Sequence, residues 1–199
     1  RGVEVIQQPD TLLSLESLNV RVQAWPLLKG KVEVDEVTLS QVAVNSANLI
    51  EGMQIKGVLG RFFLQSHGVD LSNETAVVNR TELSDTHIQL LMTDTTTTPK
   101  DTTASAPVNW KVNLHQLKLK NVSFGMKLPA DSMKMAAYIG EATIDDAKAD
   151  LKNQFYGLKQ FLLSGASASY DTGEAQPSEG FDASHMAVRN IRIGLDSLL

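Results

Sequence analysis

The sequence predicts an all-β, elongated protein: a bent, taco-like and mostly antiparallel sheet built from internal repeats, with few short helical turns. Three observations predict this fold. An apolar-x-apolar-x-x-apolar-x-apolar motif recurs along the 199 residues, a gapless repeat of 80 residues relates two parts of the chain, and one Thr-rich segment interrupts both patterns. Alternation with a period of two inside each apolar pair is typical of strands rather than helices.

The motif occurs eight times, and 29 of its 32 key positions are apolar, the exceptions being His67, Thr81 and Thr86. In a flat strand, residues i and i+3 point to opposite faces. Both apolar pairs share a face only where the strand bends or bulges between them. We therefore expect each strand to fold across its middle, with its apolar side chains inside the bend. The copies span residues 13–20, 37–44, 62–69, 81–88, 117–124, 142–149, 161–168 and 186–193.

A repeat supports this interpretation. Residues 31–90 align with 111–170 without gaps, and 11 of the 60 pairs are identical. Repeats at a fixed period indicate units that bury their edges against one another. The sequence therefore predicts a first β repeat unit within 1–92, which also holds the end of a preceding unit. A second unit and the start of a third fill 108–199, and we expect a piece of a longer protein.

Strand direction follows from the spacing between successive motifs, which alternates between long and short steps of 24, 25 and 19 residues, then 25, 19 and 25. A parallel coil needs nearly constant spacing, whereas hairpins allow alternation, so we expect antiparallel pairing. Short helical turns are indicated only within 9–15 and 25–28.

The segment 93–107 holds seven Thr and two Pro, and no apolar residue larger than Ala apart from proline. Such Thr/Pro-rich segments are typical of mobile loops on which deletions are tolerated. We expect this loop to be mobile and dispensable.

Composition excludes several classes of function. The net charge of −5, without a cluster of Lys and Arg, argues against a nucleic-acid partner. The absence of Cys excludes disulfides, thiolate nucleophiles and Cys-ligated zinc together. No stretch reaches the 18 apolar residues of a membrane-spanning helix.

Candidate catalytic and metal-ligating residues are few. The four histidines, His67, His87, His115 and His185, show no metal-ligand spacing, and the register predicts His67 inward and His87 outward. Asp182, Ser184 and His185 are adjacent in sequence, but catalytic Ser and His normally come from separate segments. We expect no enzyme activity, no metal and no cofactor.

Two further sets of residues recur at equivalent places in the repeat. Asp70 and Asp150 are each followed, three residues on, by Asn73 or Asn153. Asp and Asn stabilise turns through their own side chains, so a turn in each repeat explains them better than paired catalytic carboxylates. The repeat-equivalent pair Gly60 and Gly140 is assigned to turns in the same way.

The apolar face itself is the remaining candidate site. An exposed apolar patch larger than a few hundred Å² indicates a partner or a ligand. Two alternatives remain open: the face closes on itself as an ordinary core, or it stays partly open and binds acyl chains. The candidate groove-lining residues are Val37, Leu39, Val42, Val44, Leu64, Val69, Leu83, Ile88, Leu117, Leu119, Val122, Phe124, Ile144, Leu163, Val188 and Ile191.

One stretch resembles a known family. Alternating apolar residues in 12–22 are followed by Pro26-Leu27-Leu28, then Gly30, and then an apolar pattern. That pattern has Val32, Val34, Val37 and Leu39 at its apolar positions. This arrangement is similar to the N-terminal region of the AsmA-like/TamB family. The specific part of the resemblance covers residues 12–45.

The resemblance implies a periplasmic protein of Gram-negative bacteria, anchored in the inner membrane, with an apolar groove in a taco-shaped sheet. It implies a role in phospholipid transport to the outer membrane or in protein assembly there, with phospholipid acyl chains and an outer-membrane assembly partner. The anchor and the partner-binding region are expected outside this sequence. The alternative is a structural spacer or a surface adhesin-like repeat protein with a closed core.

Overall fold

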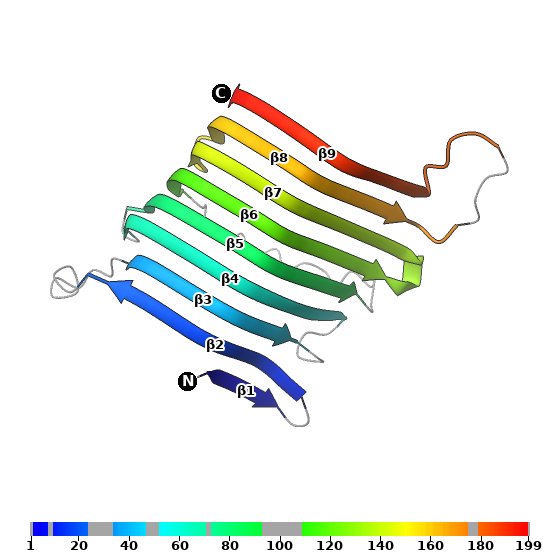
Figure 1. The fold of residues 1–199 in the computed structure, drawn as a ribbon, viewed down its shortest axis with the longest axis horizontal. Helices are drawn as coiled ribbons and strands as arrows, with labels where there is room; N and C mark the ends of the chain where they lie inside the picture. Colours follow the sequence, from blue (N-terminus) through cyan, green and yellow to red (C-terminus); the bar gives the residue numbers. More distant parts are fainter. Residues whose placement is uncertain are drawn as a thin grey trace.

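The computed structural model describes residues 2–7, 10–23, 34–46, 52–70, 73–92, 109–174 and 179–198. Within these ranges nine strands form one sheet whose spatial order follows the chain order (Figure 1). One 3₁₀ helix, η1 (Pro129–Asp131), is present there. No helix of the described ranges is long and apolar enough to span a membrane. The strands are β1 (Val3–Gln7), β2 (Asp10–Val22), β3 (Val34–Asn45), β4 (Met53–Asp70), β5 (Thr75–Met92), β6 (Lys111–Leu128), β7 (Met133–Asp150), β8 (Phe155–Asp171) and β9 (His185–Leu198).

Strand pairing is mostly antiparallel, as predicted. Every neighbouring pair of strands is antiparallel except β5 and β6, which are parallel. The all-β, single-sheet fold class is thereby confirmed. The predicted helical turn at 9–15 is wrong from Asp10 onward, since that part belongs to β2, and the one at 25–28 lies outside the described residues.

The 80-residue repeat has a direct structural counterpart. β4 and β7 begin and end 80 residues apart, and β5 and β8 begin 80 residues apart. Each unit therefore contains three strands, and translating an up-down-up unit brings two parallel strands together at the β5–β6 joint. The joints β2–β3 and β8–β9 are antiparallel, so translation relates β3–β5 to β6–β8 only.

The parallel joint bears on the predicted loop 93–107, which lies outside the described residues. β6 starts beside the start of β5, because Thr75 pairs with Lys111 and Leu91 with Lys127. Met92 and Lys111 therefore lie at opposite ends of these two strands. The expectation that the segment is mobile and dispensable stays a prediction, and the parallel joint requires a connection long enough to join those two ends.

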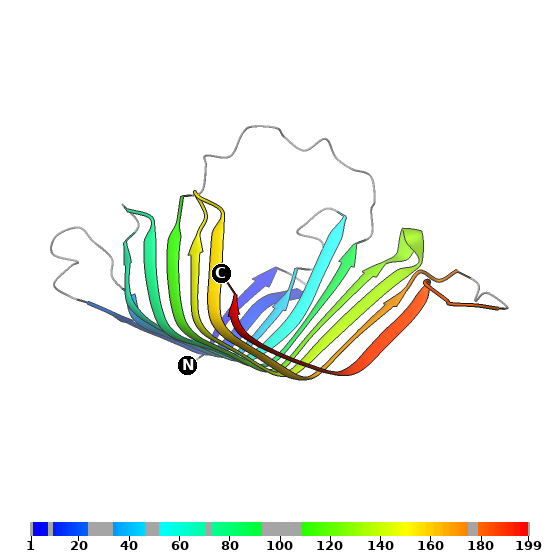
Figure 2. The ribbon, with the colours of Figure 1, turned by 90° about the horizontal axis from the view of Figure 1, so that it is seen from above.

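A first crease crosses the sheet where single residues drop out of the pairing ladder. In β3 and β4, Ser40 pairs with Arg61 and Val42 with Leu59, which leaves Gln41 and Gly60 unpaired. The same gap continues through β5, β6 and β7. Three of these residues have a left-handed backbone, with φ of 50° at Gln41, 52° at Asp85 and 52° at Asn121. The predicted bend within each strand is therefore real (Figure 2).

A second crease, which the sequence did not predict, runs beside the first. In β6 and β7, Leu114 pairs with Ala147 and Gln116 with Asp145, so His115 and Asp146 drop out of the ladder. Asp146 has φ of 50°. The two creases leave a floor about five residues wide between two walls, which gives the sheet the U-shaped section seen in Figure 2. The motifs at 62–69 and 142–149 lie on this second crease, and the others lie on the first.

His67 is exposed, so its predicted inward position is wrong. In β4, Ser66 pairs with Val78 and Gly68 with Val77, which leaves His67 bulged out of the ladder. A shift of one residue moves a side chain to the other face of the sheet. The inward position is taken instead by Ser66, which is buried and donates a hydrogen bond to the Val34 carbonyl oxygen.

Gly60 and Gly140 lie inside strands at the first crease, so their assignment to turns is wrong. A Cβ on Gly140 would stand 3.1 Å from the Gly165 carbonyl oxygen, closer than most real Cβ contacts. Glycine is present at both positions because the creased backbones approach each other too closely for a side chain.

The predicted Asp–Asn turns are confirmed. Asp70 Oδ1 accepts a hydrogen bond from the Asn73 backbone N–H at 3.1 Å, and Asp70 Oδ2 accepts one from Asn73 Nδ2 at 2.7 Å. Asp150 and Asn153 repeat both bonds at 3.1 and 2.9 Å. Each pair closes a hairpin, between β4 and β5 and between β7 and β8, at equivalent places in the two units.

Candidate functional site

The apolar residues of the motif line up from strand to strand in four continuous rows. Directly paired residues of neighbouring strands share a face, so each row runs across the sheet on one side. Two rows lie on the floor between the creases and two lie on one wall. The floor rows are Val20, Val37, Leu64, Thr81, Leu117, Ile144, Phe161, Leu195 and Leu18, Leu39, Phe62, Leu83, Leu119, Ala142, Leu163, Ile193; the wall rows are Leu15, Val42, Leu59, Thr86, Val122, Ile139, with Ala166 and Ile191, and Leu13, Val44, Gly57, Ile88, Phe124, Ala137, Ala168, Val188.

All sixteen candidate groove residues lie on this face. Fifteen belong to the four rows, and Val69 lies on the opposite wall, beside Ala76. None of the sixteen is buried, and Val188 and Phe124 are 57% and 40% exposed. The face they line is therefore open to solvent within the described part of the chain.

The burial of small residues shows that the apolar face is the inside of the bend. Beside the first crease, Thr86, Ala142 and Ala166 on the apolar face are only 3%, 5% and 4% exposed. Arg61 and Glu141, which flank the same crease on the other face, are exposed. Residues in an inner corner are sheltered by both arms, so the apolar face is concave and forms a groove.

The groove holds no large buried core. The buried apolar residues of the described ranges are Ala76, Ala142 and Ala166, and no large side chain there is fully buried. An ordinary β-domain interdigitates large apolar side chains from two layers. Here one layer is present, and its apolar side chains have no second layer among the described residues.

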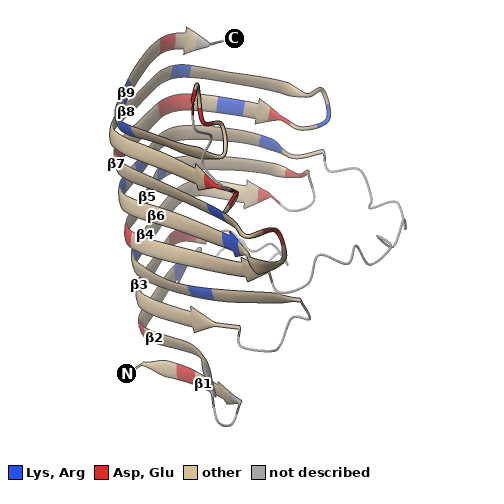
Figure 3. Cartoon of the chain, turned by 90° about the vertical axis from the view of Figure 1, so that its right-hand side faces the viewer, with Lys and Arg blue, Asp and Glu red and all other residues tan. Residues whose placement is uncertain are grey.

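Charged residues lie on the outer face. Neighbouring floor positions on that side include Glu82, Lys118 and Thr143, which pair in one row. Figure 3 shows Lys and Arg interspersed with Asp and Glu along the strands. The four inner rows contain no charged residue at their described positions. The sheet therefore separates an uncharged concave face from a mixed-charge convex face.

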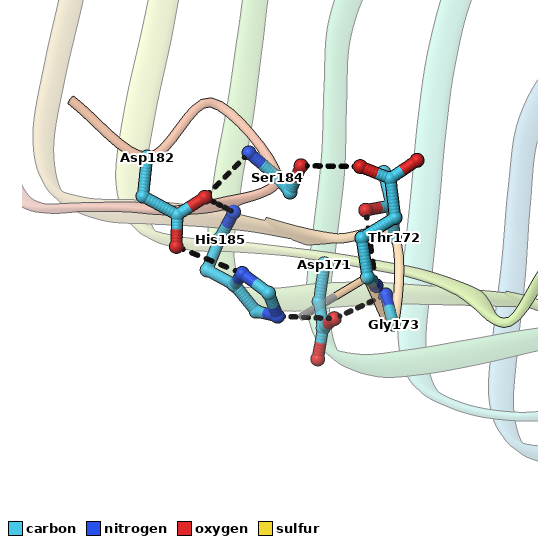
Figure 4. A network of polar contacts seen from close by, with 7 residues as sticks. Asp171, Thr172, Gly173, Asp182, Ser184 and His185 are labelled. Carbon is cyan, nitrogen blue, oxygen red and sulfur yellow. Dashed lines mark hydrogen bonds and ion pairs between the residues drawn. The ribbon is translucent and has the colours of Figure 1, made fainter. Parts of the chain in front are cut away.

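The sequence-adjacent Asp182, Ser184 and His185 do not form a catalytic triad (Figure 4). Ser184 Oγ donates to Glu174 Oε2 at 2.9 Å rather than to the imidazole. The His185 Nδ1 lies 2.9 Å from Asp182 Oδ2 and its Nε2 lies 3.4 Å from Asp171 Oδ1. Both ring nitrogens therefore face carboxylates, and the network ties the end of β8 to the start of β9.

The titratable groups with shifted pKa values are also explained by structural contacts. The hydrogen bond with His115 lowers the pKa of Asp146 on the second crease; desolvation opposes it as the next largest effect, and the hydrogen bond with Lys159 lowers the pKa further. The backbone N–H of Asn153 lowers the pKa of Asp150 in its turn. No cluster of three or more potential metal ligands occurs among the described residues.

Comparison with known proteins adds no identity: no family model matches the sequence, and no curated protein matches it.

A second concavity, on the convex face, was not predicted from the sequence. It has a volume of about 900 Å³ and is lined by residues of β4 to β9. Its signal was present as small residues at outward positions, namely Gly125, Ala136, Ser169 and Ala187. The repeated motif marks apolar inward positions only, so it does not indicate this row of small outward residues.

Proposed function

We propose that this chain is a non-enzymatic segment of a periplasm-spanning envelope protein whose apolar groove carries phospholipid acyl chains toward the outer membrane. One observation carries the proposal: four rows, apolar apart from Thr81 and Thr86, line a concave face that the described residues leave open. An open apolar groove is stable in water only if it is small or regularly occupied.

The dimensions of the groove suit an alkyl chain. The floor rows cross the eight strands β2–β9, and seven steps of roughly 4.8 Å give a groove of roughly 34 Å along the sheet. The rows run in that same direction, across the strands, so an extended hydrocarbon can contact one row from strand to strand. Burial of each methylene contributes about 0.8 kcal/mol, so apolar contact without polar recognition is sufficient for binding.

The resemblance of residues 12–45 to the AsmA-like/TamB family supplies the periplasmic setting of the proposal. Assembly of outer-membrane proteins is the other role implied by that resemblance. The groove favours the lipid role, because its inner rows offer acyl chains an apolar surface and offer a polypeptide no charged or hydrogen-bonding side chain beyond Thr81 and Thr86.

The experiment places a carboxylate on the groove floor with Leu39→Glu and Leu119→Glu. Both side chains are half-buried on the floor, where an open groove lets the new carboxylate reach water. We expect photo-crosslinking to a diazirine-labelled phospholipid to fall several-fold, while thermal unfolding shifts by only a few degrees.

Matched controls lie next to these positions on the outer face. Thr38→Glu and Thr143→Glu introduce the same charge on the convex side of neighbouring strands, and both should keep parental crosslinking. Lys118 is a poorer control because it pairs with Glu82, so a glutamate there would face a like charge. Loss of the fold in both floor variants, with no lipid crosslink in the parent protein, would favour the closed-core spacer instead.

A further inference from the structure

The concavity on the convex face has a simple structural cause. Gly125, Ala136, Ser169 and Ala187 pair with one another in a row across β6–β9, so their small side chains form a floor. One adjacent outward row holds Lys127, Lys134, Asp171 and His185, and the other holds Ser123, Tyr138 and Ser167. We call this feature the outer gutter, which lies on the outer side of the wall that carries Val122 and Phe124 on its inner side.

Two lysines dominate one bank of the outer gutter. Lys127 and Lys134 are directly opposite each other in the β6–β7 ladder, and both line the cavity. Like charges in directly opposed positions destabilise a sheet. Neither lysine forms an ion pair with a carboxylate of the described residues.

The nearest carboxylate is already engaged. Asp171 is paired with Lys134 in the ladder, but its Oδ1 accepts a hydrogen bond from the Gly173 N–H at 2.7 Å and lies 3.4 Å from His185 Nε2. The clasp shown in Figure 4 therefore holds Asp171 toward the β8–β9 connection. Arg189, which also lines the cavity, forms no ion pair with the described carboxylates either.

The polar side chains on the opposite bank form hydrogen bonds with one another or with neighbouring side chains. Tyr138 donates its phenolic hydrogen to Asn121 Oδ1 at 3.1 Å, and His87 Nδ1 lies 2.6 Å from Ser123 Oγ. These groups present ring and methylene surface to the cavity. The outer gutter thus combines two lysines that form no ion pair with a described carboxylate on one bank with a floor of hydrogen, methyl and hydroxymethyl groups. The floor row continues from Gly125 through Gln89 to Lys56, which also lines the cavity.

We propose that the outer gutter binds an anionic amphiphile, with its phosphate or comparable headgroup between Lys127 and Lys134 and its hydrocarbon along the floor of small residues. A headgroup there neutralises two opposed cations, and charge-assisted hydrogen bonds are roughly twice as strong as neutral ones. A volume of about 900 Å³ fits a small-molecule site. This site is on the face opposite the groove and does not depend on the proposed acyl-chain path.

Alanine methyl NMR separates the two faces of the sheet in one titration. Ala136 and Ala187 lie on the gutter floor, whereas Ala142 and Ala166 lie in inner rows of the groove and do not line the cavity. The probe is dodecyl phosphate below its micellar concentration, added to the full chain. We expect saturable shifts at Ala136 and Ala187, and the double substitution Lys127→Gln with Lys134→Gln should weaken this binding at least about tenfold.

Three comparisons make the test decisive. Inorganic phosphate should bind at least about tenfold more weakly than dodecyl phosphate, and dodecyl maltoside should not saturate the two gutter methyls. The matched variant, Lys118→Gln with Lys120→Gln, removes two outer lysines from outside the gutter and should bind like the parent. The Lys127/Lys134 double variant should keep the parental melting temperature or exceed it, because it removes a like-charge contact.

Each contrary result overturns the proposal in a different way. Shifts confined to Ala142 and Ala166 would assign binding to the groove alone. Equal affinity for inorganic phosphate would show that the hydrocarbon chain is not recognised. Equal affinity for dodecyl maltoside would show that the negative charge is not recognised. Unchanged binding in the Lys127/Lys134 double variant would show that these two lysines do not bind the headgroup.

Discussion

Gly60 and Asp85 approach so closely at the first crease that a Cβ on Gly60 would lie 2.7 Å from the Cβ of Asp85 and 2.9 Å from its carbonyl oxygen. Because backbone rather than a flexible side-chain end blocks the space, Gly60→Ala should lower the free energy of unfolding by about 2 kcal/mol. Gly194→Ala is the control, since its Cβ would meet Leu162 Cδ2 at an ordinary 3.7 Å. Denaturant unfolding of both variants checks this, and equal stability would show that the crease can widen freely.

Gln41 tests the backbone conformation of the same crease. Its φ of 50° is left-handed, which glycine adopts without steric cost and β-branched residues rarely adopt. Gln41→Gly should therefore unfold at a denaturant concentration no lower than the parent, whereas Gln41→Val should lose about 1 kcal/mol or more. The reverse order would mean that residue 41 leaves the left-handed region in solution.

The connection between β5 and β6 can be tested by length. Replacement of residues 93–107 with an equally long Gly/Ser segment should preserve the melting temperature within a few degrees, because only span is required. Shortening the same segment to four residues should prevent the parallel joint, since the connection from Met92 to Asn109 would then reach at most about 22 Å. Circular dichroism and thermal melts compare the two variants. A folded short variant with parental stability would contradict the parallel pairing of Thr75 with Lys111.

Acid should weaken the repeat turns. The pKa of Asp150 is lowered by the Asn153 backbone N–H, and also by the Asn153 amide and Lys111. Because the pKa of Asp150 is lower in the folded state, the ionised carboxylate stabilises the fold at every pH above the ordinary aspartate pKa of 3.8. That stabilisation is lost as the pH falls below 3.8.

Asp150→Asn tests this acid dependence. The variant should be less stable at neutral pH and should show a flatter loss of stability below about pH 4, because the titrating group is gone. The control is Asp131→Asn, at an exposed carboxylate without a hydrogen bond to the other described residues. Urea unfolding as a function of pH measures both variants. Parallel acid limbs for Asp150→Asn and the parent would contradict the assignment.

The strands, the bend and the groove-lining residues were predictable because each rests on local alternation between neighbouring residues. The Asp150–Asn153 turn was predictable for the same reason, since a side chain that bonds three residues away is a local event. The motif alone does not distinguish the second crease from the first, because the spacers Asp145-Asp146 and Gln65-Ser66 have the same two-residue length as the spacers at the first crease. His67 shows the limit of the method: a bulge one residue long reverses the face, and only the pairing with Val77 and Val78 fixes its place.

The parallel direction of β5 and β6 was also beyond a local pattern. The parallel direction follows from the number of strands in each repeat unit. When a unit with an odd number of strands is repeated by translation, its last strand is parallel to the first strand of the next unit. The outer gutter depends on four small residues that are distant in sequence and meet only through the register of four strands.

Different features of the sequence determine the depth, the width and the length of the groove. The depth depends on the number of residues between a crease and the nearest hairpin in each strand. The width depends on the spacing of the two creases, which is six residues in β7, from Gly140 to Asp146. The length of the groove depends instead on the number of strands. Duplication of one three-strand unit would extend the groove by roughly 14 Å and leave its cross-section unchanged. Such a scaffold can be fitted to a wider or narrower compartment by gain or loss of whole units, without redesign of a single inward side chain.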